Sequence, residues 1–426
     1  MATRAKRRRL NGSRSPESLL PENHVKQFPN PPLAQASDDD RKAWQGFCEI
    51  ESEPALFNVM LRDFGVKGVK VQEVVSLDDE MLVFLHKPVY GLIFLFRWKE
   101  DDAEKQEQSC PEGLWFANQT VNNACASVAL LNIVNNIEGI ELGPALQHFK
   151  EFTMPFTPAL RGNAIGNFEF IKRVHNSYAR KMDMLNLDLQ LKNDATAKKS
   201  KASKKNEVAD ESEAGFHFIA FVPALGKVWK FDGLERQPQN LGECPDGDWL
   251  GMAKPEILAR MAGYEEDQIE FSILGLVKDP IINLVADLAQ NVKELQAVRE
   301  RLDLFNPPAE VPSSTKADNS KLPDRTLLGP DGSYKLTQDD IDKAEIPSDK
   351  MTRYTSASQD QLRSYENELV DKQKELRSSV KEEQHSQEAD DNHAAGRKHD
   401  YASAVNRWLS MLARKKKIEE LVNELQ

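Results

Sequence analysis

Apolar residues recur at helical spacing in several stretches of the chain. In the first of these, residues 54–64, a proline follows Glu53 and apolar side chains then appear every three or four positions, at Leu56, Val59, Met60 and Phe64. This spacing places them along one face of a helix that begins at Pro54. Similar patterns predict helices over residues 142–152, 168–182 and 284–302.

Other stretches carry the pattern of β-strands. Residues 67–77 are rich in valine, and residues 89–98 form a continuous apolar run that is typical of a central strand. Residues 216–233, FHFIAFVPALGKVWKFDG, hold two apolar runs around a Pro/Gly turn, which predicts a β-hairpin. A further strand is expected within residues 267–279.

Polar segments interrupt these elements. Residues 1–40 are rich in Pro, Ser, Asn and charged residues, which predicts a disordered, basic N-terminal extension. Residues 153–167 contain two prolines, two glycines and two asparagines, which favours a loop long enough to have a function. Residues 194–215 are of low complexity and are predicted to be a mobile insert. We therefore expect one folded domain over residues 41–280.

The character of the chain changes after residue 280. We expect a helix and a Pro/Ser/Asp-rich linker over residues 281–350, and a helical C-terminal extension over 351–426. Its last part, 397–426, carries two apolar stripes at helical spacing, one of Tyr401, Val405, Trp408, Leu409 and Leu412, and one of Ile418, Leu421, Val422 and Leu425. Such a helical hairpin needs a surface to bury against, either on the chain's own domain or on a partner helix.

Composition narrows the class of protein. The 426 residues carry a net charge of -12, which disfavours binding to nucleic acid. The four cysteines include no CxxC pair, which argues against a disulfide framework or a zinc site and fits a reducing compartment. No apolar stretch is long enough to span a membrane. Lys6 to Arg9 could be a nuclear localisation patch or a basic run without a role, and we predict a location in cytoplasm and nucleus.

The sequence NQTVNNACASVALL places Cys125 at the start of an apolar helix. Asn122 and Asn123 can accept hydrogen bonds from first-turn N–H groups, and nearly every residue from Ala124 onward is apolar, which predicts a helix buried on all sides. A thiol in the first turn lies at the positive end of the helix dipole, which favours the thiolate. The alternative is a small apolar residue that fills space, since unpaired cysteine is commonly buried.

His217 stands out among the eight histidines because it lies within an apolar strand, where a buried imidazole needs a partner. A hairpin in which residue 221 faces 228 would place Asp232 directly opposite His217. A His–Asp pair satisfied within the core is the alternative. Together with a lone thiol at a helix start, however, the pair favours a Cys-His-Asp catalytic triad.

Gln119 lies just before the predicted helix start. Its side-chain amide, together with the backbone N–H of Cys125, could form an oxyanion hole for a tetrahedral intermediate. A loop glutamine without a role is the alternative. Cys48, Cys110 and Cys244 are given no role and are expected to be ordinary core or surface residues.

These segments resemble the ubiquitin C-terminal hydrolase (UCH, peptidase C12) family of cysteine deubiquitinases. NQTVNNACASVALL is similar to the active-site signature, FHFIAFVPALGKVWKFDGLERQP to the His and Asp segments, and WQGFCEIESEPALFNVMLRDFGVKGVKVQEV and PVYGLIFLFRW to the N-terminal segment, over about residues 44–279. The resemblance implies Cys125 as nucleophile, His217 as general base and acid, Asp232 as the residue that orients it, and Gln119 as transition-state stabiliser. It also implies an α/β (α+β), papain-like fold whose central, mostly antiparallel sheet is enclosed by helices.

Within the family, GRKHDYASAVNRWLSMLARKKKIEELV resembles the terminal element of two long-tailed types, the proteasome-associated one and the BRCA-associated histone H2A deubiquitinase. In both, this element engages a helical activator domain, so residues 397–426 are expected to bind such a protein of the proteasome or of a chromatin complex. The chain lacks the very long central region of the second type, which favours the first. The resemblance also suggests a crossover loop, which spans the active site, at about residues 153–167.

The prediction is therefore a ubiquitinyl hydrolase that cleaves after the C-terminal glycine of ubiquitin through an acyl-enzyme, with ubiquitin and its conjugates as partners and with no cofactor or metal. A papain-type protease is a second candidate. The spacing from Cys125 to His217 and the lack of a signal peptide argue against it. A ubiquitin-binding scaffold subunit with weak activity is the third.

Overall fold

The computed structural model describes residues 36–98, 103–201, 215–245, 247–263, 271–305, 326–415 and 417–418. The chain divides into two compact units, of which one is Gln35–Tyr401 and the other contains residues 402–426. The disorder expected for residues 1–35, and the apolar stripe beyond Ile418, lie outside the described residues. Asp38–Ala43 form helix α1, capped by Ser37, so regular structure begins before the predicted boundary.

The larger unit is built on a six-stranded sheet with the order β1-β6-β2-β3-β4-β5. Every neighbouring pair is antiparallel. The strands are β1 (Val69–Glu73), β2 (Val89–Arg97), β3 (Phe216–Ala224), β4 (Lys227–Phe231), β5 (Gln239–Glu243) and β6 (Ser272–Lys278). All predicted strands are thus confirmed, and the continuous apolar run of 89–98 is an inner strand paired on both edges.

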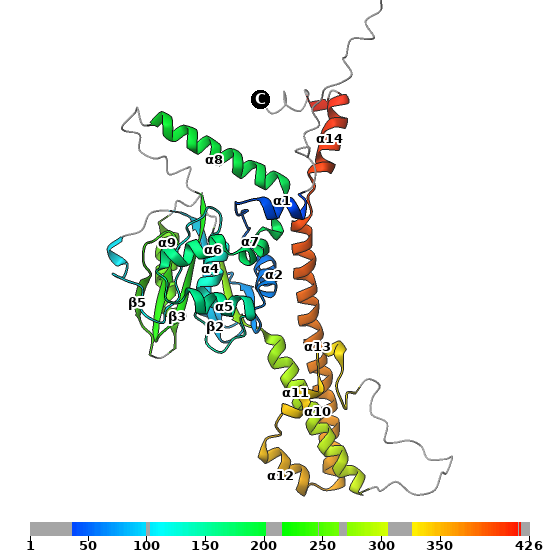
Figure 1. Cartoon of the computed structure of the whole chain (residues 1–426). Helices are drawn as coiled ribbons and strands as arrows, with labels where there is room; N and C mark the ends of the chain where they lie inside the picture. The colour runs from blue at the N-terminus through cyan, green and yellow to red at the C-terminus, as the bar shows by residue number, and fades with distance from the viewer. Residues whose placement is uncertain are drawn as a thin grey trace, which may run out of the picture. The chain divides into compact units, whose positions relative to one another are not determined.

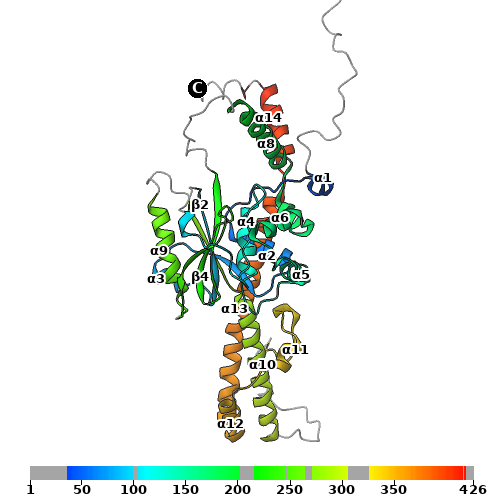
Figure 2. The same cartoon turned by 60° about the vertical axis from the view of Figure 1, so that its left-hand side comes forward.

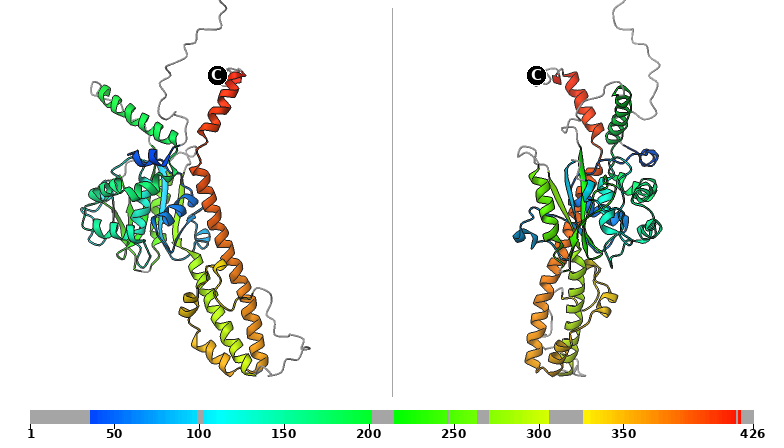
Figure 3. Two further views of the ribbon diagram at one scale, coloured as in Figure 1. Left: turned by 45° about the vertical axis from the view of Figure 1, so that its right-hand side comes forward. Right: turned by 90° about the vertical axis from the view of Figure 1, so that its left-hand side faces the viewer.

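Helices cover both faces of this sheet (Figure 2). One face carries α2 (Pro54–Phe64), α4 (Cys125–Val134), α5 (Pro144–Thr153), α6 (Pro158–Asn167) and α7 (Glu169–His175); the other carries α3 (Asp79–Leu82) and α9 (Trp249–Ala262). A large apolar core lies on the α4 side, and a smaller one lies between α9 and the opposite face of β2. The predicted fold, a sheet enclosed by helices, is therefore confirmed, and Figure 3 shows it from the edge of the sheet.

The β3–β4 hairpin forms where it was predicted, but its register differs. Ala224 pairs with Lys227 across a two-residue turn of Leu225 and Gly226, which both have positive φ (52° and 71°). The prediction had treated Pro223 as part of the turn. Instead, Pro223 continues β3 beyond the last residue paired with β2, where no ladder bond needs the N–H that proline lacks. The true register is displaced by two residues, which keeps every side chain on its predicted face.

The loop conformation expected over residues 153–167 is wrong, because α6 occupies most of this segment. Only a short turn separates α5 from α6, whose first turn is capped by Thr157 and begins at Pro158. The glycines have a packing role. A Cβ on Gly162 would lie 2.1 Å from the carbonyl oxygen of Asn118, and one on Gly166 would lie 3.0 Å from Val121. Glycine is common in loops, so the composition suggested one. Here, however, the two glycines are needed because the backbone and side chains of neighbouring residues come too close to α6 for a Cβ.

The predicted insert and linker also contain helices. Helix α8 (Lys181–Lys201) includes the first residues of the stretch 194–215, whereas residues 202–214 lie outside the described residues. Short helices η5 (Gly332–Tyr334), α11 (Gln338–Lys343) and α12 (Ser348–Ser356) occupy the end of the predicted linker. Thr337 and Asp340 form a capping box at α11, a signal that the sequence TQDD carries.

Two long helices pack along each other beyond the sheet (Figures 1 and 3). They are α10 (Pro280–Phe305) and α13 (Gln359–Lys398), the second within the helical extension predicted over 351–426. Their contact buries two small apolar clusters with α11 and α12. The two helices are therefore stabilised by a core that they share.

The C-terminal half of α13 also packs against α2 and β1. Asn58 donates to Asp390 at 2.9 Å, and Lys70 Nζ lies 2.6 Å from Glu383 Oε2. Arg62 pairs with Asp391, and Arg397 pairs with Glu51 at 2.7 Å. The extension up to Tyr401 therefore belongs to the same compact unit as the predicted domain of residues 41–280.

The second unit contains helix α14 (Ala402–Arg414) and none of its residues is buried. The apolar side chains of the predicted first stripe are largely exposed, with Trp408 at 57% and Leu409 at 44%. In the part of the chain that the structure describes, no helix combines the length and the apolar composition needed to cross a bilayer.

Candidate active site

Cys125 is the first residue of α4, as the sequence predicted. The helix is buried along its whole length after that residue, and the thiol itself is partly exposed. The expected asparagine cap is wrong, because Ala124 occupies the N-cap position. Asn123 instead adopts a left-handed conformation (φ 61°), which turns the chain into the helix. Since alanine has no side-chain acceptor, the first-turn N–H groups are not capped from that position and can face a ligand.

His217 and Asp232 meet at the end of the hairpin. His217 lies on β3 and Asp232 directly follows β4, and Nε2 of the imidazole lies 2.6 Å from Oδ1 of the carboxylate. Both side chains are buried, at 4% and 2% exposed. The backbone N–H of Leu234 donates to the same carboxylate oxygen at 2.9 Å. The predicted contact between the two residues is confirmed.

Cys125 completes the cluster, because its thiol is close enough to the His217 imidazole to raise the pKa of that ring. With Nε2 directed at Asp232, the other ring nitrogen, Nδ1, is the one left for sulfur. Burial lowers the pKa of His217, but the hydrogen bond to Asp232 and the interaction with Cys125 outweigh it and raise that pKa to about 9. Burial raises the pKa of Asp232, and the hydrogen bond from His217 overcomes this, so the net pKa is lowered. The pair thus holds an imidazolium beside a carboxylate.

Gln119 is held between α6 and the chain that follows β4. Its backbone N–H donates to Gly233 O at 2.8 Å, and the adjacent Asn118 donates through Nδ2 to Glu235 O at 2.5 Å. Gly233 allows this approach, because a Cβ there would lie 3.1 Å from Gln119 and 3.2 Å from Val128 of α4. The segment is therefore fixed beside the first turns of α4. The side-chain Oε1 of Gln119 has no hydrogen-bond partner among the described residues.

One buried imidazole near this site was not among the predicted site residues. His175 is completely buried and contacts Ser127 of α4 through Nδ1 at 2.7 Å. A signal was present, because Ile171, Val174 and His175 share one helical face, and the first two are core residues.

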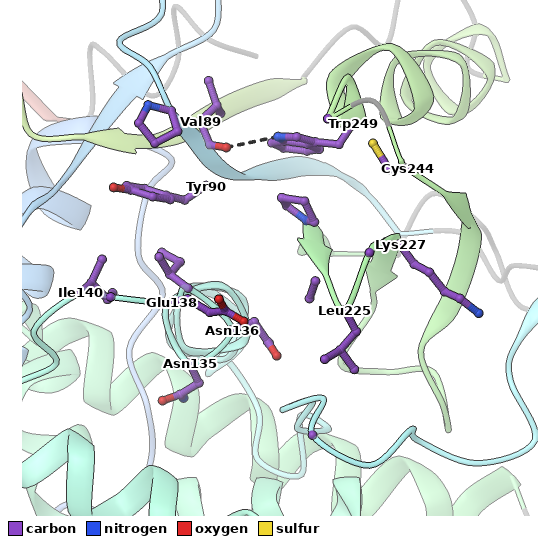
Figure 4. A pocket seen from close by; sticks show the side chains of 18 of the residues that line it. Val89, Tyr90, Asn135, Asn136, Glu138, Ile140, Leu225, Lys227, Cys244 and Trp249 are labelled. Atoms are coloured by element: carbon purple, nitrogen blue, oxygen red, sulfur yellow. Dashed lines mark hydrogen bonds between the residues drawn. The ribbon is translucent and has the colours of Figure 1, made fainter.

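The cavity drawn in Figure 4 is a separate feature. It has a volume of about 990 Å³ and lies around the C-terminal end of α4, where Asn135 and Asn136 line it together with Tyr90, Leu225 and Trp249. The indole of Trp249 donates to Val89 O at 3.1 Å across one wall. Since Cys125 begins α4, this cavity is at the other end of the helix and contains none of the predicted site residues.

Comparison with known proteins agrees with this geometry. Residues 47–262 match the family model "Ubiquitin carboxyl-terminal hydrolase, family 1". The chain is 36% identical over 277 residues to ubiquitin carboxyl-terminal hydrolase isozyme L5 of Dictyostelium discoideum, covering 65% of this chain and 73% of that one. It is 34% identical over 253 residues to ubiquitin carboxyl-terminal hydrolase BAP1 of Xenopus tropicalis, covering 55% of this chain and 34% of that one.

Among solved structures, Trichinella spiralis UCH37 bound to ubiquitin vinyl methyl ester is similar, with 31% identity and a TM-score of 0.44. It covers 57% of this chain and 86% of that chain. The family match spans the helix of Cys125, the hairpin of His217 and Asp232, and most of the sheet. The chain belongs to the family 1 ubiquitin carboxyl-terminal hydrolases, which are thiol-dependent deubiquitinases.

Proposed function

We propose that Cys125, His217 and Asp232 form the catalytic triad of this hydrolase, with Gln119 as the stabiliser of the transition state. The observation that carries the proposal is the cluster around His217, whose Nε2 lies 2.6 Å from Asp232 Oδ1 and whose pKa is raised by both Asp232 and Cys125. A nucleophile, a base in reach of it and a third group that orients the base are what acyl transfer by cysteine requires.

Acylation starts from the thiolate–imidazolium pair. The Cys125 sulfur attacks the carbonyl carbon of ubiquitin's C-terminal glycine, and the carbonyl oxygen becomes an oxyanion. The N–H of Cys125 and the side-chain amide of Gln119 donate to that oxyanion. His217 gives its proton to the leaving amine, the C–N bond breaks, and a thioester remains on Cys125.

Deacylation uses the same imidazole in the other direction. Neutral His217 takes a proton from a water molecule as the water attacks the thioester carbonyl. The C–S bond then breaks, ubiquitin leaves with a free carboxylate, and the thiolate and imidazolium are restored. Asp232 stays ionised throughout, since its hydrogen bond from His217 stabilises the imidazolium and fixes the ring orientation.

Ubiquitin and its conjugates are the proposed substrates. Membership of the ubiquitin carboxyl-terminal hydrolase family supports this. The net charge of -12 also favours encounter with the basic C-terminal tail of ubiquitin.

A ubiquitin probe with a C-terminal electrophile tests the assignment. Wild-type protein should form a covalent adduct, Cys125→Ala should form none, and Cys110→Ala should react like the wild type. Labelling that survives in Cys125→Ala would disprove Cys125 as the nucleophile. Failure of the wild type to react would instead favour a ubiquitin-binding scaffold with weak activity.

We further propose that a helical activator domain of a proteasomal or chromatin protein binds α14. The exposed side chains of Trp408, Leu409 and Met411 support this. An exposed apolar helix face of this kind is typical of a surface that binds a partner, because burying it is energetically favourable. A truncation after Tyr401 tests it, because this removes α14 and leaves α13, which packs on the catalytic domain. Hydrolysis of a ubiquitin reporter should respond to the activator protein in the full chain alone, and equal responses would refute the proposal.

The location in cytoplasm and nucleus is also proposed. The basic run from Lys6 to Arg9 supports import into the nucleus. Fusing residues 1–15 to a fluorescent reporter, with the run replaced by alanine as control, would test it: a reporter that stays out of the nucleus would count against import.

A further inference from the structure

His175 is a buried imidazole that the proposed chemistry does not use. It ends α7 and is completely buried, with Nε2 2.7 Å from the carbonyl oxygen of Cys48 and Nδ1 2.7 Å from Ser127 Oγ. Because a carbonyl oxygen can only accept, Nε2 carries the proton and donates to Cys48. Nδ1 therefore accepts from the hydroxyl of Ser127. Burial lowers the pKa of His175 to about 4, against the opposite effect of the Cys48 hydrogen bond, so the ring is neutral at pH 7.

The two partners of His175 come from distant parts of the chain. Cys48 belongs to the segment that precedes α2, and its N–H donates to Asn176 Oδ1 at 3.1 Å. The amide of Asn176 in turn donates to Gly46 O at 2.9 Å. His175 and Asn176 thus anchor this N-terminal segment, which also packs edge-on against the imidazole through Phe47 (ring centroids 4.9 Å apart).

Ser127 is the partner that matters for chemistry. It lies two residues after Cys125 in the first turn of α4 and is completely buried. The neighbouring residues of the helix are apolar. Because apolar packing is not directional, it resists small rotations of the helix about its axis only weakly. A hydrogen bond is directional. At the other end of α4, Asn132 supplies such a bond by accepting from Ala117 N at 2.8 Å.

We propose that His175 is a positioning residue for the nucleophile: by linking the Ser127 hydroxyl to the Cys48 carbonyl, it fixes the rotation of the first turn of α4 and hence the direction of the Cys125 thiol toward His217. The inference rests on the proposed role of Cys125. His175 itself has no access to substrate, because it is buried and both ring nitrogens are engaged.

Two substitutions of His175 distinguish the effect of its hydrogen bonds from the effect of its ring volume. His175→Phe keeps a ring of similar size and removes both hydrogen bonds, whereas His175→Gln retains one donor and one acceptor. For each variant, the rate of labelling by the ubiquitin electrophile is measured. The pH dependence of alkylation of Cys125 by iodoacetamide is measured as well, with mass spectrometry to follow the modification of that residue. Ile257→Ala, in the core on the other face of the sheet, is the matched control for lost stability.

The Phe variant should label at least about tenfold more slowly, since small misplacement of a reacting group is costly. Its alkylation profile should also move along the pH axis, because the contact of Cys125 with His217 loosens. The Gln variant should stay within about threefold of wild type, and Ile257→Ala should lose stability without changing the rate or the profile.

Wild-type labelling at Cys125 together with unchanged rate and profile in His175→Phe would overturn the positioning role and leave the nucleophile assignment intact. Labelling that persists in Cys125→Ala would overturn the nucleophile itself. If His175→Phe does not fold, Ser127→Ala decides, because it removes only the hydroxyl. An unchanged rate and profile in that variant overturns the inference, and a slower rate with a moved profile supports it.

Discussion

His217 Nε2 lies 2.6 Å from Asp232 Oδ1, although the two residues are not directly opposite each other in the hairpin. Phe231 pairs with Ala220, so Asp232 continues the register toward Ile219 and reaches His217 as a diagonal neighbour on the same face. This diagonal reach places the carboxylate behind the imidazole while the other ring nitrogen stays available to Cys125.

Asp232→Asn should weaken this arrangement without changing the shape of the site. Loss of the negative charge removes a cause of the raised pKa of His217, which is about 9, so the alkaline limb of the pH–rate profile should move to lower pH. The value of kcat/KM should fall at least about tenfold, since the amide no longer stabilises the imidazolium. An unchanged profile would show that Asp232 does not act on His217.

The same pKa shift predicts a pH dependence of stability. The folded-state pKa of His217 is raised from 6.5 to about 9, so binding of its proton favours the folded state. That contribution is fully present below the unfolded-state pKa and is lost as pH rises through about 9. Between pH 7 and pH 9.5 the wild type should therefore lose more unfolding free energy than Asp232→Asn, as measured by urea denaturation. Parallel curves would contradict this.

Gln119→Ala should lower kcat rather than binding. Removal of one oxyanion donor costs about 10²- to 10³-fold in kcat in a preorganised site. KM for a ubiquitin reporter should change little, because the donor acts on charge that develops only in the transition state. A rise in KM with kcat unchanged would assign Gln119 to substrate binding. Gln338→Ala, on an exposed glutamine of α11, is a control that should leave both constants unchanged.

Gly162→Ala should disturb the segment of Asn118 and Gln119 from the side of α6. The added Cβ would lie 2.1 Å from Asn118 O, so α6 or the chain leading to Gln119 has to shift. We expect a loss of about 1–3 kcal/mol in unfolding free energy, accompanied by a lower kcat. Gly396→Ala is the matched helical control, because no atom lies within 4 Å of its Cβ position. It should be neutral or stabilising by roughly 0.5–1 kcal/mol. Equal effects of the two substitutions would refute the packing argument.

The contact of α13 with the catalytic domain is open to a double-mutant cycle. Lys70 and Glu383 are about four-fifths buried, with side chains 20% and 21% exposed and 2.6 Å between Nζ and Oε2. The cycle of Lys70→Ala and Glu383→Ala should give a coupling energy of about 0.5–1.5 kcal/mol that weakens with added salt. The exposed pair of Lys343 and Asp339 within α11 should couple less strongly. Zero coupling for Lys70 and Glu383 would mean that α13 does not dock on β1 in solution.

Sequence by itself determined the features that depend on local pattern. The helix that starts at Cys125 and the hairpin that joins His217 to Asp232 follow from short-range spacing, because helix and hairpin geometry bring nearby residues together. Even an error of two residues in the register left His217 and Asp232 on the same face, since the side-chain period of a strand is two.

Only the tertiary structure decided the features that depend on long-range packing. Gly162 and Gly166 resembled loop residues, yet they are small because Asn118 and Val121 approach α6 closely. His175 was not singled out by the sequence pattern, yet it is buried between Cys48 and Ser127. Polar positions on α13 gave no sign of a partner, yet they meet charged residues of α2 and β1. In each case the deciding neighbour is far away in the chain, and neither composition nor periodicity carries information about such a neighbour.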